Sequence, residues 1–191
     1  MRQFARPFPI TRLSLEARVL YTGFLLFLVL GLASSVWLYA DSFGALSDRS
    51  AVEYYRGGAA PAPVADEAGG PVLELPDEAA APEPLRLEKP ARQVMETFHF
   101  HLFTVPVVLL IVGHLFMLTS LSVRLKVGVI AFASAATFVH LLAPLLVRFS
   151  GPGWGALMPV SVVGAALGWL PMLLWPLWEM WRPLPAEAAE G

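Results

Sequence analysis

Residues 97–119 read TFHFHLFTVPVVLLIVGHLFMLT, a run without Asp, Glu, Lys or Arg. A helix rises about 1.5 Å per residue, so roughly 20 apolar residues cross the hydrocarbon core of a bilayer. Three further uncharged runs cover residues 19–40, 127–147 and 155–178. Backbone groups in lipid must be hydrogen-bonded internally, and these runs lack the alternation of a membrane strand. The sequence therefore predicts an all-α integral membrane four-helix bundle.

The composition agrees with a membrane protein and excludes several kinds of site. Hydrophobic residues make up 57% of the chain, whereas soluble domains have about 45–50%. The chain has no cysteine, which excludes disulfides, covalently attached haem and iron–sulfur clusters. The net charge of −2 gives no indication of nucleic-acid binding. No nucleophile–base pair or phosphate-binding loop is visible, so a self-contained enzyme with catalytic residues is not expected.

The segments outside the four runs have distinct compositions. Residues 1–18 mix arginines with apolar side chains, as in an interfacial arm. Residues 41–96 form an acidic loop rich in Pro and Ala, which we expect to be partly disordered over 59–84. Within it, 41–58 is expected to form a short helix on the membrane surface, begun by a capping box at 50–53 (SAVE). Residues 179–191 are expected to be a tail.

The charges predict an orientation in the membrane. The N-terminal arm carries four arginines and one acid, and the turn between the second and third runs carries Arg124 and Lys126. Loop 41–96 instead contains eleven acidic and five basic residues. The positive-inside rule then places both termini in the cytoplasm and the long loop in the periplasm of a bacterial inner membrane. The lipid bilayer is thus an expected partner.

The fourth run contains a Gly164-x-x-x-Gly168 motif. Small residues allow helices in a membrane to approach closely. The motif fits packing within one bundle and dimerisation of two chains equally well.

Four histidines lie in or beside these runs, and two of them match in depth. His101 lies 21 residues before Ser122, and His140 lies 18 residues after it. If a short turn near Ser122 joins antiparallel helices, the two imidazoles lie within about 5 Å of the same depth. His99 points about 200° away from His101, and His114 lies about 20 Å deeper.

Three interpretations of these histidines remain open. His101 and His140 could ligate a haem iron or another metal, with Arg148 beside the haem propionates. The histidines could instead serve a proton or a quinone without any metal. They could also be purely structural, with His140 bonded to a carbonyl near Pro144 and His114 to a threonine or the backbone.

The motifs HFH at 99–101, Gly113-His114 and His140 together resemble small four-helix integral membrane cytochromes b. The resemblance implies haem b, a quinone, and other membrane or periplasmic redox subunits as partners. It makes all four histidines candidate cofactor-binding residues, with His101 and His140 as the iron ligands.

Two functions are therefore carried forward. The first is a membrane subunit of an electron-transfer system that holds one haem between the second and third runs. The second is a non-catalytic accessory or assembly subunit of a membrane complex. A transporter is less well supported, because the four runs show no inverted repeat.

Overall fold

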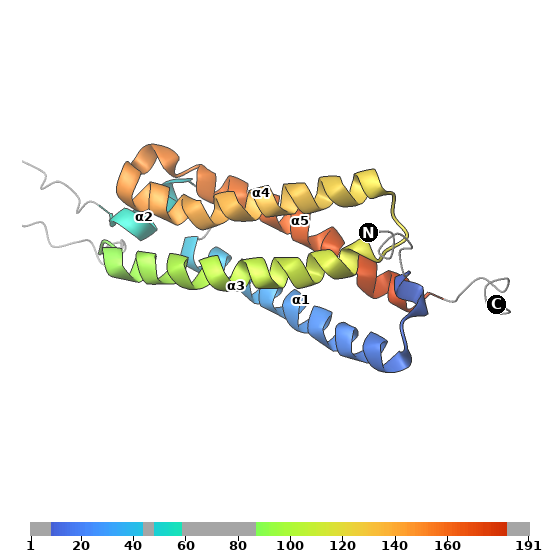
Figure 1. Cartoon of the computed structure of the whole chain (residues 1–191). Helices are drawn as coiled ribbons and strands as arrows, with labels where there is room; N and C mark the ends of the chain where they lie inside the picture. The colour runs from blue at the N-terminus through green and yellow to red at the C-terminus, as the bar shows by residue number, and fades with distance from the viewer. Residues whose placement is uncertain (1–8, 44–47, 59–86, 183–191) are drawn as a thin grey trace, which may run out of the picture.

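The computed structural model describes residues 9–43, 48–58 and 87–182. Within these residues every regular element is helical (Figure 1). Four described helical segments are long and apolar enough to cross a membrane, namely Leu15–Phe43, Ala91–Met117, Val123–Ser150 and Pro152–Met180. The predicted all-α bundle with four membrane-length helices is confirmed. The disorder expected for 59–84 falls on residues outside the described part.

The main helices are α1 (Leu15–Phe43), α2 (Asp48–Arg56), α3 (Ala91–Met117), α4 (Val123–Leu145) and α5 (Leu157–Met180). Shorter turns are η1 (Ile10–Arg12), a π-helical η2 (Leu146–Ser150) and η3 (Pro152–Trp154). Several helices extend past the ends of the uncharged runs, because a charged residue can lie outside the hydrocarbon core and still belong to the helix.

Helices α4 and α5 make the closest contact in the bundle. A Cβ added to Gly168 would lie 2.6 Å from the Cα of Ala133, and one added to Gly164 would lie 3.4 Å from the Cβ of Ala136. Both glycines of the motif therefore face α4 of the same chain. Packing within one bundle accounts for the motif, and dimerisation is not needed to explain it.

One end of the bundle is held together by polar contacts with the α3–α4 turn. Glu179 of α5 is 2% exposed, and its carboxylate accepts hydrogen bonds from the Ser120 N–H (2.7 Å) and from Trp175 Nε1 (2.9 Å). The N–H of the fully buried Ile10 donates to the carbonyl of Leu118 at 3.0 Å. Glu179 belongs to α5, although the sequence placed it in the tail.

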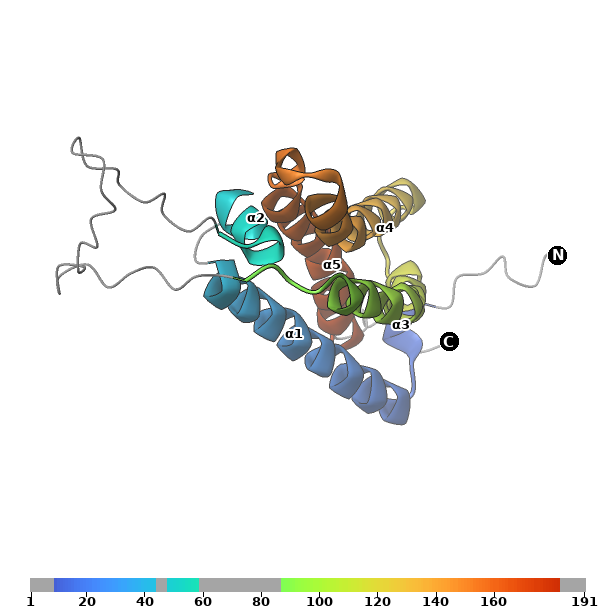
Figure 2. The same cartoon turned by 90° about the vertical axis from the view of Figure 1, so that its left-hand side faces the viewer.

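The opposite end carries α2, which lies beside the end of α1 (Figure 2). Its Ala51 is fully buried in a cluster with Phe43, Ala143, Val147 and Met158. The predicted short helix is confirmed, but it packs onto the bundle. The predicted capping box is wrong, because α2 begins at Asp48 and Ser50 already lies inside the helix.

Helix α1 crosses the others obliquely (Figures 1 and 2). It packs against α5 and α2 rather than closely against α3. Most of its large side chains are exposed and face the surroundings of the bundle, as expected for a helix in contact with lipid.

Candidate ligand-binding site

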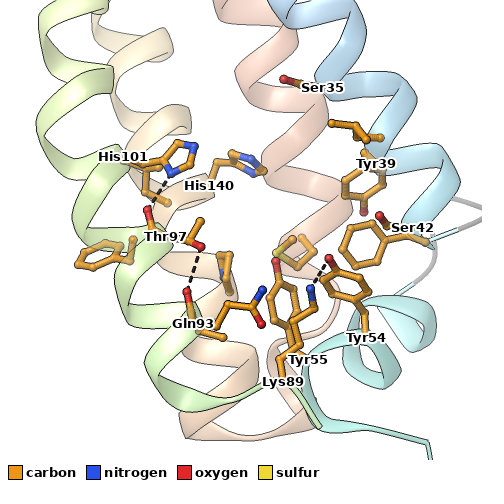
Figure 3. Close-up of a pocket in the computed structure, with 17 residues that line it drawn as sticks. Ser35, Tyr39, Ser42, Tyr54, Tyr55, Lys89, Gln93, Thr97, His101 and His140 are labelled. Atoms are coloured by element: carbon orange, nitrogen blue, oxygen red, sulfur yellow. Dashed lines mark hydrogen bonds between the residues drawn. The ribbon is translucent and has the colours of Figure 1, made fainter. Parts of the chain in front are cut away.

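A cavity of about 350 Å³ lies at the end of the bundle that carries α2 (Figure 3). All five main helices contribute to its lining. His101 and His140 lie at the end of the cavity farther from α2, while Tyr54, Tyr55 and Lys89 lie at the end beside α2 (Figure 3). The structure thus brings His101 of α3 and His140 of α4 to one shared space.

The protonation of His101 follows from its backbone contact. Nδ1 of His101 lies 2.7 Å from the carbonyl oxygen of Thr97, one turn earlier on α3. A carbonyl oxygen only accepts hydrogen bonds, so Nδ1 carries the proton and donates it. In a neutral imidazole the other nitrogen, Nε2, then has a free lone pair.

His140 has the same tautomer for a different reason. Its Nδ1 lies 3.1 Å from Oγ of Ser161 on α5, and this Oγ lies 3.0 Å from the carbonyl oxygen of Met158. A hydroxyl has one proton, which Ser161 donates to Met158. Ser161 therefore accepts from Nδ1–H of His140, and Nε2 of His140 also keeps its lone pair. Metal-bound histidines are typically fixed in this way by a bond at the second nitrogen.

Tyr39 of α1 contributes a polar group without a partner. Its side chain lines the cavity, and its hydroxyl is buried with no hydrogen-bond partner among the described residues. Buried polar groups in native structures are nearly always hydrogen-bonded. The phenol of Tyr39 is therefore a polar group beside the cavity that the described residues leave unsatisfied.

Lys89 lies at the end of the cavity beside α2. Its ammonium is 2.6 Å from the hydroxyl of Tyr54 and 3.9 Å from the centre of that ring. The backbone N–H of Lys89 donates to the carbonyl of Tyr55 at 3.3 Å. Burial raises the pKa of the Tyr55 phenol above its ordinary value, and the neighbouring phenols of Tyr54 and Tyr39 raise this pKa further.

Arg148 has other partners than the sequence suggested. Its guanidinium forms an ion pair with Glu88, and its Nε donates to the carbonyl of Lys89 at 3.0 Å. Arg148 is not among the residues that line the cavity. Its contacts instead fasten the segment before α3 to η2.

The other two histidines lie elsewhere on α3. The ring of His99 packs edge-on against Phe103, with 5.1 Å between ring centres. His99 and His114 are exposed, as His101 is, but unlike His101 neither lines the cavity. Within residues 9–43, 48–58 and 87–182, no group of three or more His, Asp or Glu side chains is arranged to hold a metal ion. Two imidazoles are enough to hold a haem, because the porphyrin ring itself supplies the other ligands of the iron.

Fold and site together define a multi-pass helical membrane protein with a cavity inside the bundle. A family model described as a transmembrane helical domain matches residues 45–187. The chain belongs to this family, Aq_1264_TM. No curated protein and no solved structure matches the chain. None of these comparisons links it to cytochromes b.

Proposed function

We propose that the protein is a membrane subunit of an electron-transfer system and holds one haem b between α3 and α4. Nε2 of His101 and Nε2 of His140 would be the two iron ligands. The observation that carries this proposal is the pair of imidazoles on one cavity, each with Nδ1–H donated to the protein and Nε2 left free. When bound, the haem supplies one-electron exchange between ferrous and ferric iron.

The chain supports this donor set in three ways. Both histidines lie within long helices, which hold their side chains more rigidly than loops do. Thr97 and Ser161 fix the two ring orientations and make each imidazole a better ligand. The lining also has an apolar part, with Phe98, Leu141 and Met158 among its members, which would pack against the faces of a flat hydrophobic ring.

The test is a visible spectrum of the full chain purified in detergent after haem-replete expression. We expect the Soret and reduced bands of a low-spin b-type haem. His101→Ala and His140→Ala should abolish these bands, whereas His99→Ala and His114→Ala are matched controls that should keep them. A wild-type protein that stays colourless even after incubation with haemin would contradict the proposal, as would bands that survive both His101→Ala and His140→Ala.

A haem-free result would favour the other functions. Quinone co-extracted with colourless protein would identify the cavity as a quinone site. A fixed membrane partner that co-purifies with a variant lacking all four histidines would favour the accessory subunit.

We also propose that the end of the bundle with the α3–α4 turn faces the cytoplasm of a bacterial inner membrane. Among the described residues, this end has five basic side chains against two acidic ones, Glu16 and Glu179, whereas the opposite end has five of each; the basic ones at this end are Arg12, Arg18, Arg124, Lys126 and Arg182. Both termini would then be cytoplasmic, and the cavity would lie toward periplasmic redox partners.

Because the chain has no native cysteine, single cysteines can report this orientation. A membrane-impermeant maleimide added to spheroplasts should label Arg92→Cys and leave Arg124→Cys unlabelled. The reverse labelling pattern would overturn the proposed orientation.

A further inference from the structure

The end of the cavity beside α2 carries several hydrogen-bond donors but no carboxylate among its described lining residues. Lys89 brings an ammonium, Gln93 an amide, and Tyr39 and Tyr54 bring hydroxyl groups. None of the described residues that line the cavity is Asp or Glu. This excess of donors is suited to a ligand that ends in an anionic acceptor.

The ammonium of Lys89 has unused bonding capacity. It has three N–H donors, and the described contacts are the hydrogen bond to Tyr54 and the ring of Tyr54 below it. No described carboxylate forms an ion pair with Lys89. Asp41 lines a neighbouring hollow together with Lys89 but is not within ion-pair distance. A half-buried cation at the edge of a membrane is stabilised by an anion.

The backbone contacts of Lys89 hold its position at the cavity. Its N–H is bonded to Tyr55 of α2, and its carbonyl is bonded to Arg148 of η2. These bonds connect the residue to two elements that are distant in sequence. Arg148 thus acts on the site through the backbone of Lys89, as a positioning residue.

On the opposite side of the histidines, the described residues offer no such partner. There Ser161 is bonded to His140 and Met158, and the indole N–H of Trp169 donates to Thr137 at 2.8 Å. These groups satisfy one another and carry no positive charge. A carboxylate directed this way would be buried without a cation, which is strongly unfavourable.

Haem carries two carboxylates on one edge of its ring. From the distribution of donors we infer that the ammonium of Lys89 and the phenol of Tyr39 receive the carboxylate edge of the group held by His101 and His140. This inference rests on the proposed function, and it assigns the end of the cavity beside α2 as a carboxylate-binding subsite. The contact would also supply the missing partner of the buried Tyr39 hydroxyl.

The experiment compares two ligands that differ only at these carboxylates. The full-length apoprotein in detergent is titrated with haemin and with haemin dimethyl ester, and the ratio of the two dissociation constants is measured. We expect the wild type to bind the free acid about tenfold more tightly, as for loss of a charge-assisted hydrogen bond. Lys89→Met and Tyr39→Phe should each lower this ratio severalfold while the low-spin spectrum is retained.

Arg92→Met is the matched control, because Arg92 lies on α3 at the same end, pairs with Glu96 and does not line the cavity. It should keep the wild-type ratio of dissociation constants. General electrostatic attraction would instead lower the ratio in Arg92→Met as well, and partitioning of the ester into detergent would affect all variants equally. Equal binding of acid and ester by the wild type, or a ratio unchanged in both Lys89→Met and Tyr39→Phe, would overturn this inference alone. A wild type that binds neither ligand would overturn the proposed function as well.

Discussion

The Nδ1 atom of His140 on α4 lies 3.1 Å from the hydroxyl oxygen of Ser161 on α5. This contact joins the two helices that pack most closely, because Gly168 of α5 lies directly against Ala133 of α4. The orientation of the His140 ring therefore depends on a residue that is not itself a candidate ligand. Helix α5 contributes to the site by fixing the imidazole that α4 presents.

The first prediction concerns Ser161→Ala. The variant leaves Nδ1–H of His140 without its acceptor, and loss of such a supporting bond typically weakens metal binding by about 10–100-fold. We expect haem affinity to fall by a factor in this range, measured by titration of the apoprotein. Ser134→Ala is the control, because the bond of Ser134 within the described part of the chain goes to the carbonyl of Ile130 on its own helix, and Ser134 does not line the cavity. Equal affinities for the two variants would contradict the assigned role of Ser161.

Depth counting on the sequence was sufficient to pair His101 with His140, because a short turn fixes the relative depth of two antiparallel helices. The same argument reaches Ser161, which lies 10 residues after Gly151 while His140 lies 11 before it. Counting residues from a turn also cannot give the tautomers of the two histidines, because these depend on the carbonyl of Thr97 and on the hydrogen bond from Ser161 to Met158.

The other end of the cavity was beyond the reach of the sequence. Lys89 meets Tyr54 and Tyr55 across a long acidic segment rich in Pro and Ala, and no periodicity fixes how such a segment brings its ends together. Glu179 was missed because it follows the last uncharged run and resembles the start of a tail. Its burial results from two donors, Ser120 and Trp175, that only the folded turn brings to it.

The second prediction concerns this buried carboxylate. Glu179→Gln keeps the shape of the side chain but replaces one accepting oxygen with an NH₂ group. One of the two donors, the Ser120 N–H or the Trp175 indole N–H, then loses its acceptor at a cost of about 1–3 kcal/mol. We expect a lower thermal unfolding midpoint in detergent. Glu96→Gln, which removes only an exposed pair with Arg92, should change stability by less than about 0.5 kcal/mol. A Glu179→Gln midpoint equal to that of the wild type would contradict this account.

The third prediction concerns the pKa of Tyr55. Burial favours the neutral phenol, so the pKa of Tyr55 in the folded protein lies above its ordinary value of 10.0. Because the folded pKa is raised, the neutral phenol of Tyr55 contributes to the free energy of unfolding. This contribution is fully present below the unfolded pKa and is lost as pH rises through the folded pKa. An alkaline titration of phenolate absorbance should therefore differ between the wild type and Tyr55→Phe only above the ordinary range. If the phenolate absorbance of the wild type and of Tyr55→Phe already differs near the ordinary pKa of tyrosine, Tyr55 is accessible to water and the prediction is wrong.

The last prediction concerns the contact between α4 and α5. In Gly168→Ala the new methyl group would lie 2.6 Å from the Cα of Ala133, a backbone atom that moves only if the helices separate. We expect a destabilisation of about 1–3 kcal/mol, the usual cost of overpacking. Because the separation also moves Ser161 relative to His140, haem affinity should fall together with stability. Gly128→Ala is the control, since a Cβ there meets nothing within 4 Å. If Gly168→Ala unfolds at the temperature of Gly128→Ala, the close approach of α4 and α5 does not hold the bundle together.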